Sequence, residues 1–138
     1  MIKQYDAVPG MKARLIGPED ILSLPYKGAI VANDGEVVVR STDGKTVSKV
    51  KDDTNIKFGI VLRHGIGKSG KNAEGKEAYR DTDMIPVMTI GAIWVKPTTP
   101  VIDIASTVYV KTSNGTSAQP LGSLSPDATD GTEFPNAS

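Results

Sequence analysis

A single histidine at the end of an apolar segment is the first residue whose type and position could support catalysis. His64 follows Leu62-Arg63 and precedes Gly65. An imidazole beside an Arg is an arrangement suited to a nucleophile that takes up a phosphoryl group. A phosphatase of this kind needs a second His, and His64 is the only His among the 138 residues. We therefore interpret His64 as a surface or hydrogen-bonded residue and predict no catalytic role for it.

The stretch that follows this His nearly fits a phosphate-binding loop. Residues 65–72 match the pattern G-x-x-x-x-G-K-[ST] except at the last position. Asn72 stands where the pattern requires the hydroxyl that binds magnesium, and Gly75 interrupts the helix that must follow. We therefore interpret residues 64–83 as a long, Gly- and Lys-rich surface loop or a mobile hairpin.

The remaining polar residues offer no metal or cofactor site. Asp81 and Asp83 lie two positions apart, and Asp52-Asp53 form a second acidic pair. A calcium loop needs a denser set of oxygen ligands and a distal Glu, which neither pair has. The chain has no Cys, which excludes disulfides and thiolate ligands. The sequence therefore predicts no metal, no cofactor and no enzymatic activity.

The charge balance and the hydropathy pattern argue against two classes of partner. Lys plus Arg and Asp plus Glu number 16 each, so the formal net charge is zero. Binding to nucleic acid needs a concentration of positive charge, and we therefore predict no nucleic-acid partner. No apolar run approaches the roughly 20 residues that span a bilayer, and the N-terminus lacks the apolar core of a signal peptide. We expect no membrane association and synthesis in the cytoplasm.

Short β-branched and apolar segments between glycine turns predict strands rather than helices. The Asp34-Gly35 pair between two such segments predicts a hairpin. Trp94 lies in a β-type segment and either packs in the core or faces a partner. The predicted strands cover residues 29–32, 37–40, 47–50, 56–62, 84–90 and 107–111, and residues 93–96 continue the strand beyond a bend at Gly91.

The spacing of these strands, about 8–14 residues, predicts an all-β fold: a small β-barrel or sandwich. Three regions follow from the pattern. Residues 1–27 are expected to form an extended N-terminal arm, because Pro and Gly break them into short pieces. Residues 28–119 are expected to form the β-barrel domain with the long Gly/Lys-rich loop. Residues 120–138 are expected to be a turn-rich C-terminal tail.

The order of these elements resembles a known family. Gly28-Ala29-Ile30-Val31 is followed by the Asp-Gly turn and by Phe58-Gly59-Ile60-Val61; then come the approach Tyr79-Arg80-Asp81, the strand Ile85–Gly91, Ile93-Trp94-Val95 and Val108-Tyr109-Val110. In this order, residues 28–119 resemble the structural cement, or head decoration, proteins of tailed phages. One departure is the C-terminus, because these proteins usually close with an apolar strand. Here that strand is absent, or the N-terminal arm or a neighbour supplies it.

The resemblance implies a structural protein of the virion, made in the host cytoplasm and located on the capsid surface. Its partner would be the major capsid protein, whose shell it would stabilise, and it could also associate with itself as a trimer. Another virion or secreted β-rich binding module, such as a tail or spike fragment, is the alternative, and a phosphate-handling enzyme is a third. The expected contacts lie in the arm and in loop 64–83: Ile2, Tyr5, Met11, Leu15, Ile16, His64, Lys68 and Lys71.

Overall fold

The structure is a computed structural model, and it describes residues 8–13, 19–49, 57–63, 66–98 and 107–134. Within these ranges the secondary structure consists of strands alone, which confirms the all-β prediction. The strands are β1 (Asp20–Pro25), β2 (Val37–Arg40), β3 (Val47–Ser48), β4 (Phe58–Val61), β5 (Gly70–Lys71), β6 (Glu77–Ala78), β7 (Met84–Ile90), β8 (Tyr109–Lys111), β9 (Leu124–Ser125) and β10 (Gly131–Glu133).

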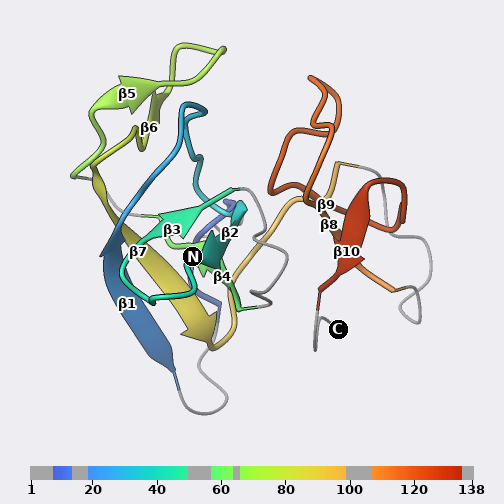
Figure 1. Cartoon of the computed structure of the whole chain (residues 1–138), viewed down its shortest axis with the longest axis horizontal. Coiled ribbons are helices and arrows are strands. Elements are labelled where there is room, and N and C mark those ends of the chain that lie inside the picture. Colours follow the sequence, from blue (N-terminus) through green and yellow to red (C-terminus); the bar gives the residue numbers. More distant parts are fainter. Residues whose placement is uncertain (1–7, 14–18, 50–56, 64–65, 99–106, 135–138) are drawn as a thin grey trace, which may run out of the picture.

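The largest sheet has five strands in the order β1-β7-β4-β2-β3 and curls into a half-barrel (Figure 1). Every residue of β1 is paired with β7, so residues 20–25 of the predicted arm belong to this sheet. Just beyond β1, Tyr26 forms a parallel bridge with Val47 of β3. The Lys27 N–H donates to the Val47 carbonyl at 2.8 Å. The two outer strands of the sheet therefore meet at one end of the curl.

Strand β7 contributes apolar side chains to both faces of the half-barrel. Its sequence, Met-Ile-Pro-Val-Met-Thr-Ile, is apolar on both faces, as is typical of a strand buried on both sides. Because side chains alternate along a strand, Ile85 and Val87 point into the curl, while Met84 and Met88 point outward. The inner core consists of Tyr26, Ala32, Val38, Val47, Val61, Tyr79, Ile85 and Val87, with Leu24 packed against it.

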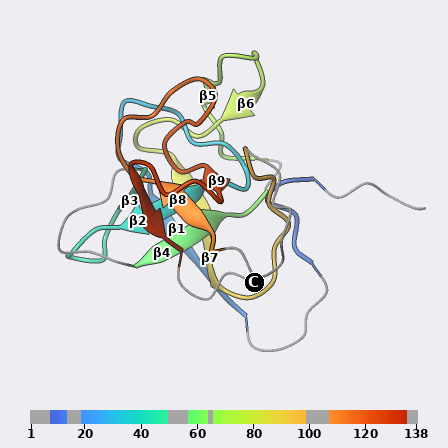
Figure 2. The ribbon, with the colours of Figure 1, turned by 90° about the vertical axis from the view of Figure 1, so that its right-hand side faces the viewer.

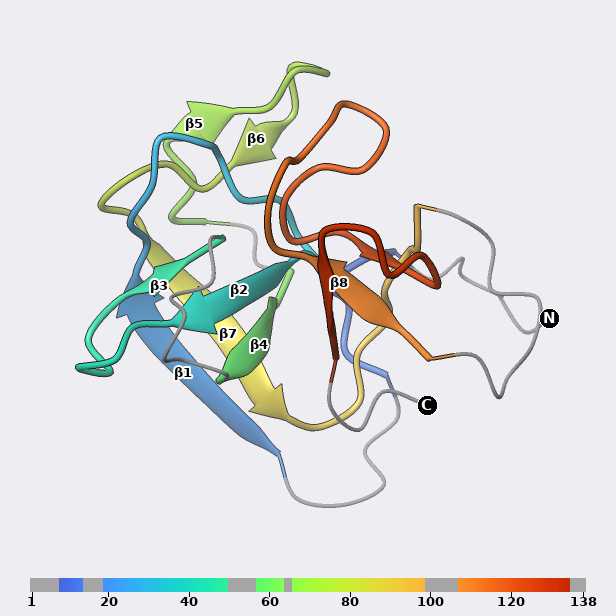
Figure 3. The same cartoon turned by 45° about the vertical axis from the view of Figure 1, so that its right-hand side comes forward.

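A second sheet, in the order β10-β8-β9, packs against the outer face of the first (Figures 2 and 3). A separate apolar cluster lies where the two sheets meet. It contains buried Val37, Ile60, Val110 and Leu124, with Phe58, Ile93, Val95, Val108 and Phe134 packed against them. Successive residues of β2 therefore serve different cores: Val38 faces the curl, whereas Val37 faces the second sheet.

Two local predictions were wrong: the hairpin between residues 29–32 and 37–40, and the continuation of strand 84–90 by residues 93–96. Residues 29–32 were predicted to pair with residues 37–40 across the turn at Asp34-Gly35. The turn is present, but Ala32 pairs with Tyr79 through two backbone hydrogen bonds of 2.8 and 2.9 Å. Strand β2 already has β3 on one edge and β4 on the other, so no edge remains for residues 29–32. Beyond the bend at Gly91, Ile93 likewise leaves the sheet and pairs with Lys12.

Residues 120–134, predicted to be part of a turn-rich tail, contain strands β9 and β10. A glycine in this region joins the two sheets. The Gly122 carbonyl accepts the Val37 N–H at 2.8 Å, and its own N–H donates to the Lys111 carbonyl at 2.9 Å. A Cβ at Gly122 would lie only 2.5 Å from the Val37 carbonyl oxygen. Glycine is therefore required at position 122, because the backbone of Val37 lies too close to leave room for a side chain.

Comparing Gly122→Ala with Gly75→Ala should distinguish two costs of an added Cβ. One is the steric clash with neighbouring atoms, and the other is the strain of a left-handed backbone conformation. Both glycines have left-handed φ values, +81° and +80°, but no atom lies within 4 Å of a Cβ at Gly75. Gly75→Ala should cost about 1–2 kcal/mol from its φ alone. Gly122→Ala should lower the free energy of unfolding by roughly 3 kcal/mol or more, because the sheets must separate. Urea denaturation measures both, and equal losses would contradict the close approach.

Candidate functional site

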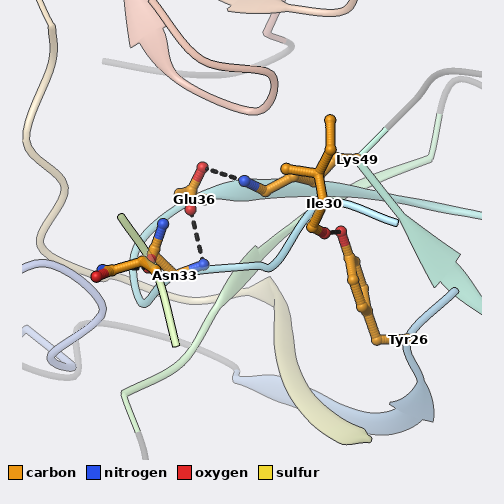
Figure 4. Close-up of polar contacts among 6 residues, drawn as sticks. Tyr26, Ile30, Asn33, Glu36 and Lys49 are labelled. Atoms are coloured by element: carbon orange, nitrogen blue, oxygen red, sulfur yellow. Dashed lines mark hydrogen bonds and ion pairs between the residues drawn. The ribbon is translucent and has the colours of Figure 1, made fainter. Parts of the chain in front are cut away.

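A buried ion pair between Lys49 and Glu36 joins the end of β3 to the segment that precedes β2 (Figure 4). Lys49 Nζ lies 2.7 Å from Glu36 Oε2, and the two side chains are 4% and 13% exposed. Glu36 Oε1 accepts the N–H of Asn33 at 2.7 Å. The ammonium of Lys49 is the only partner of Oε2 among the residues that the structure describes. Both charges are therefore satisfied locally, which suits a structural role.

Tyr26 is held beside this pair, where its hydroxyl donates to the Ile30 carbonyl. Burial raises the pKa of Tyr26 to about 12, and the negative charges of Glu36 and Asp81 add to the shift. A hydroxyl with this pKa stays protonated at neutral pH. Tyr26 therefore acts as a hydrogen-bond donor that fixes residues 26–30.

Lys68, one of the predicted contact residues, is occupied within the fold. Its Nζ lies 2.9 Å from Asp34 Oδ2 and 5.4 Å from the centre of the Tyr79 ring. The Lys68 side chain is only 10% exposed. Burial raises the pKa of Tyr79 to about 12, with smaller contributions from Asp34 and Asp83. This cluster joins the start of the Gly/Lys-rich segment to the 33–36 turn and leaves little of Lys68 for a partner.

Asp83 fastens the two ends of the same segment to each other. Its carboxylate accepts the Ser69 N–H at 2.9 Å, the Ser69 hydroxyl at 2.6 Å and the Arg80 N–H at 2.9 Å. Burial acts to raise the pKa of Asp83, but these hydrogen bonds outweigh it and hold the pKa below its ordinary value. Residues 69 and 80–83 therefore form one hydrogen-bonded unit.

Between these ends, β5 and β6 form a hairpin that projects beyond the half-barrel (Figure 1). Asn72 Oδ1 accepts the N–H groups of Glu74 and Lys76, both at 3.0 Å, which defines the tight turn. The Asn72 amide also donates to Asn33 Oδ1 at 2.9 Å. The residue predicted to disqualify a phosphate loop is thus the capping residue of a hairpin. Lys71 is exposed on β5.

The predicted contact residues of the N-terminal region lie largely outside the described residues: Ile2, Tyr5, Leu15 and Ile16, together with His64. Met11 is described and half-buried. Its carbonyl accepts the Trp94 N–H at 2.9 Å, and the Gly10 N–H donates to the Trp94 carbonyl at 2.8 Å. Residues 10–13 are therefore paired with residues 92–94 of the same chain.

A groove lined mainly by apolar side chains, called the apolar groove below, lies beside these residues, where the first sheet meets the second. Two adjoining hollows of about 370 and 400 Å³ share four lining residues: Ile60, Gly91, Ile93 and Phe134. The rings of Phe58 and Phe134 face each other there with centroids 5.8 Å apart. Ile90 and Trp94 border the hollows and are 53% and 50% exposed. Trp94, left ambiguous by the sequence, thus presents half of its surface to solvent.

The described residues contain no cluster of three or more His, Cys, Asp or Glu side chains that could hold a metal ion. Within the same residues, no helix has the length and apolarity required to cross a membrane. The organised features of the described residues are structural polar clusters, a projecting hairpin and an apolar groove.

Comparison with known proteins identifies the family. A family model described as structural cement protein (E217 gp24/Pam3 gp6) matches residues 2–138. The chain belongs to this family. A search of the curated proteins found no match. The match extends beyond both ends of residues 28–119, the region that resembles cement proteins in its order of elements. This phage cement protein is therefore a structural component associated with the capsid of the virion.

Sequence reasoning missed the polar clusters and the groove of this cement protein. Glu36 follows a predicted turn and Lys49 follows a short strand, so neither has a local signal of burial. Their contact depends on how β3 folds back on β2. The sequence contained only a weak indication that Ile90 and Trp94 are exposed. They belong to an apolar stretch that runs from the strand through Gly91 into the next segment, as buried residues also would.

Removing one partner of the Lys49–Glu36 pair should destabilise the fold more than replacing both charged side chains by neutral ones. Lys49→Met leaves the Glu36 carboxylate buried and unpaired, and should lower the free energy of unfolding by about 3 kcal/mol. Adding Glu36→Gln removes that charge while keeping an acceptor for the Asn33 N–H, so the double variant should lose less than the sum of the singles. Lys76→Met is the control, because the Lys76–Glu74 pair is 77% and 73% exposed and should contribute below ~0.5 kcal/mol. Strict additivity in urea denaturation would argue against the buried pair.

Asp83 should contribute to the acid sensitivity of the fold. Its pKa is lower in the folded state than the ordinary 3.8, so the unfolded chain takes up the proton more readily. The stabilisation is present above that ordinary pKa and is lost as the pH falls through the lowered folded-state pKa. Asp83→Asn should therefore reduce stability at neutral pH and flatten its decline between about pH 5 and pH 2. Parallel unfolding curves for both proteins across this window would contradict the assignment.

Proposed function

We propose that this protein binds the major capsid protein on the outer surface of the assembled shell and stabilises the shell without a catalytic role. The observation that carries the proposal is the match of the structural cement family to residues 2–138. A cement function needs a stable body with surfaces that contact neighbouring subunits. Repetition by capsid symmetry would let many weak contacts give strong retention.

The contacts are proposed to involve the N-terminal region and the β5–β6 hairpin. The hairpin is a defined projection, held by Asn72 at its turn and by Asp83 at its base. It carries the exposed Lys71, whereas Lys68 is paired with Asp34 inside the fold. We therefore assign the charged contact of this segment to Lys71. The N-terminal contact includes Met11 together with Ile2, Tyr5, Leu15 and Ile16. A trimer of the chain on the shell is part of the proposal.

Reconstitution on shells that lack this protein tests the proposal. Such shells should retain the added chain on sedimentation, and calorimetry should show that they melt at a higher temperature. Lys71→Glu should weaken retention by about tenfold, because it reverses a contact charge. Lys45→Glu is the matched control, since Lys45 is an exposed lysine in the turn between β2 and β3. Shells that neither retain the protein nor gain heat stability would refute the function. Sedimentation of the free and bound chain reports whether it forms a trimer.

A further inference from the structure

The apolar groove at residues 90–95 is lined by uncharged side chains in the part of the chain that the structure describes. None of these described residues is Lys, Arg, Asp or Glu, although 23% of the chain is charged. The apolar side chains of the lining include Phe58, Ile60, Ile93, Val95 and Phe134. A neutral lining of this kind complements uncharged apolar side chains and disfavours charged ones, because an unpaired charge would lose its hydration.

Among the described residues, the backbone beside the groove is a strand edge without a partner. Ala92 and Trp94 bond toward residues 10–13, so the backbone groups of Ile93 and Val95 point to the opposite side. None of the hydrogen bonds between described residues uses the N–H or carbonyl of Ile93 or Val95. Unpaired backbone donors and acceptors in extended conformation are a template for an added strand.

Another possible edge in the described part of the chain, that of β1, is less suited to a partner. Tyr26 bonds toward residues 82 and 83, whereas Lys27 bonds toward Val47 on the opposite side. By alternation, Pro25 faces that same outer edge, where its missing N–H cannot pair with a new strand. The bridge from Tyr26 to Val47 also occupies the end of this edge. The edge at Ile93 and Val95 has neither obstacle.

We propose that residues 90–95 receive an extended, uncharged apolar segment of a shell subunit, which adds as a β-strand to the edge formed by Ile93 and Val95. Its backbone pairs with these two residues, and its side chains fill the two hollows beside Phe134. Ile90 and Trp94 then close over the added strand. This inference rests on the proposed binding to the shell, and it identifies the chemistry of the segment that is bound.

A matched pair of variants on β7 tests the docking surface. Ile90 and Met84 both point outward and are 53% and 54% exposed, but only Ile90 borders the groove. Ile90→Lys should weaken retention on shells at least about tenfold, since it places a charge against the apolar segment. Met84→Lys should change retention by less than about twofold, and equal thermal unfolding of the two variants shows that both fold. Equal retention of both variants would overturn the proposal.

Hydrogen exchange distinguishes an added strand from a side-chain contact alone. Wild-type protein bound to shells should show slowed exchange at the amides of Ile93 and Val95 compared with the free protein. Unchanged exchange at these amides would overturn strand addition, even where Ile90→Lys weakens retention. If Ile90→Lys instead abolishes self-association of the free chain and leaves shell retention intact, the occupant is a second copy and the proposal is wrong. Failure of the wild-type protein to bind shells at all would refute the proposed function itself.

Discussion

The burial of β7 residues on both faces, Ile85 and Val87 inside the curl and Met88 outside it, is the constraint on which the fold depends. Ile85 and Val87 require the curl of the first sheet, while Met88 on the other face requires cover from outside. Curling brings β1 and β3 together at Tyr26 and Val47, and the second sheet provides the outside cover over Ile60. Two small cores thus replace one large core, as suits a chain with only 5% aromatic residues.

The polar clusters are a consequence of this curled arrangement. Segment 26–36 connects β1 to β2 and is bridged to Val47 and Tyr79, which buries part of its backbone and charged groups. Glu36 pairs with Lys49 there, Tyr26 donates to Ile30, and Asp34 pairs with Lys68 at the hairpin base. Polar residues that looked in the sequence like surface or loop residues thus join segment 26–36 to the end of β3 and to the hairpin base.

Much of the strand content could be predicted from the sequence, since Val37–Arg40, Phe58–Val61 and Met84–Ile90 have strong local patterns. The partners of residues 29–32 could not, because pairing depends on which edges remain free after distant strands have met. Strands β9 and β10 are two and three residues long and largely polar, so they exist only through pairing with β8. The family resemblance was confirmed over a longer range than the motifs indicated. The groove was not predictable, because it combines residues from both sheets.

The pairing of β1 with β7 has a consequence for how the protein reaches its folded state. Thr89 and Asp20, which are hydrogen-bonded across these strands, lie 69 positions apart in the chain. A newly made chain therefore leaves β1 without its partner until most of the polypeptide has left the ribosome, and closing so long a loop slows folding. During that interval Leu22 and Leu24 stay exposed to water. The folding rate and the solubility of the new chain should therefore depend on how quickly β7 is synthesised and pairs with β1.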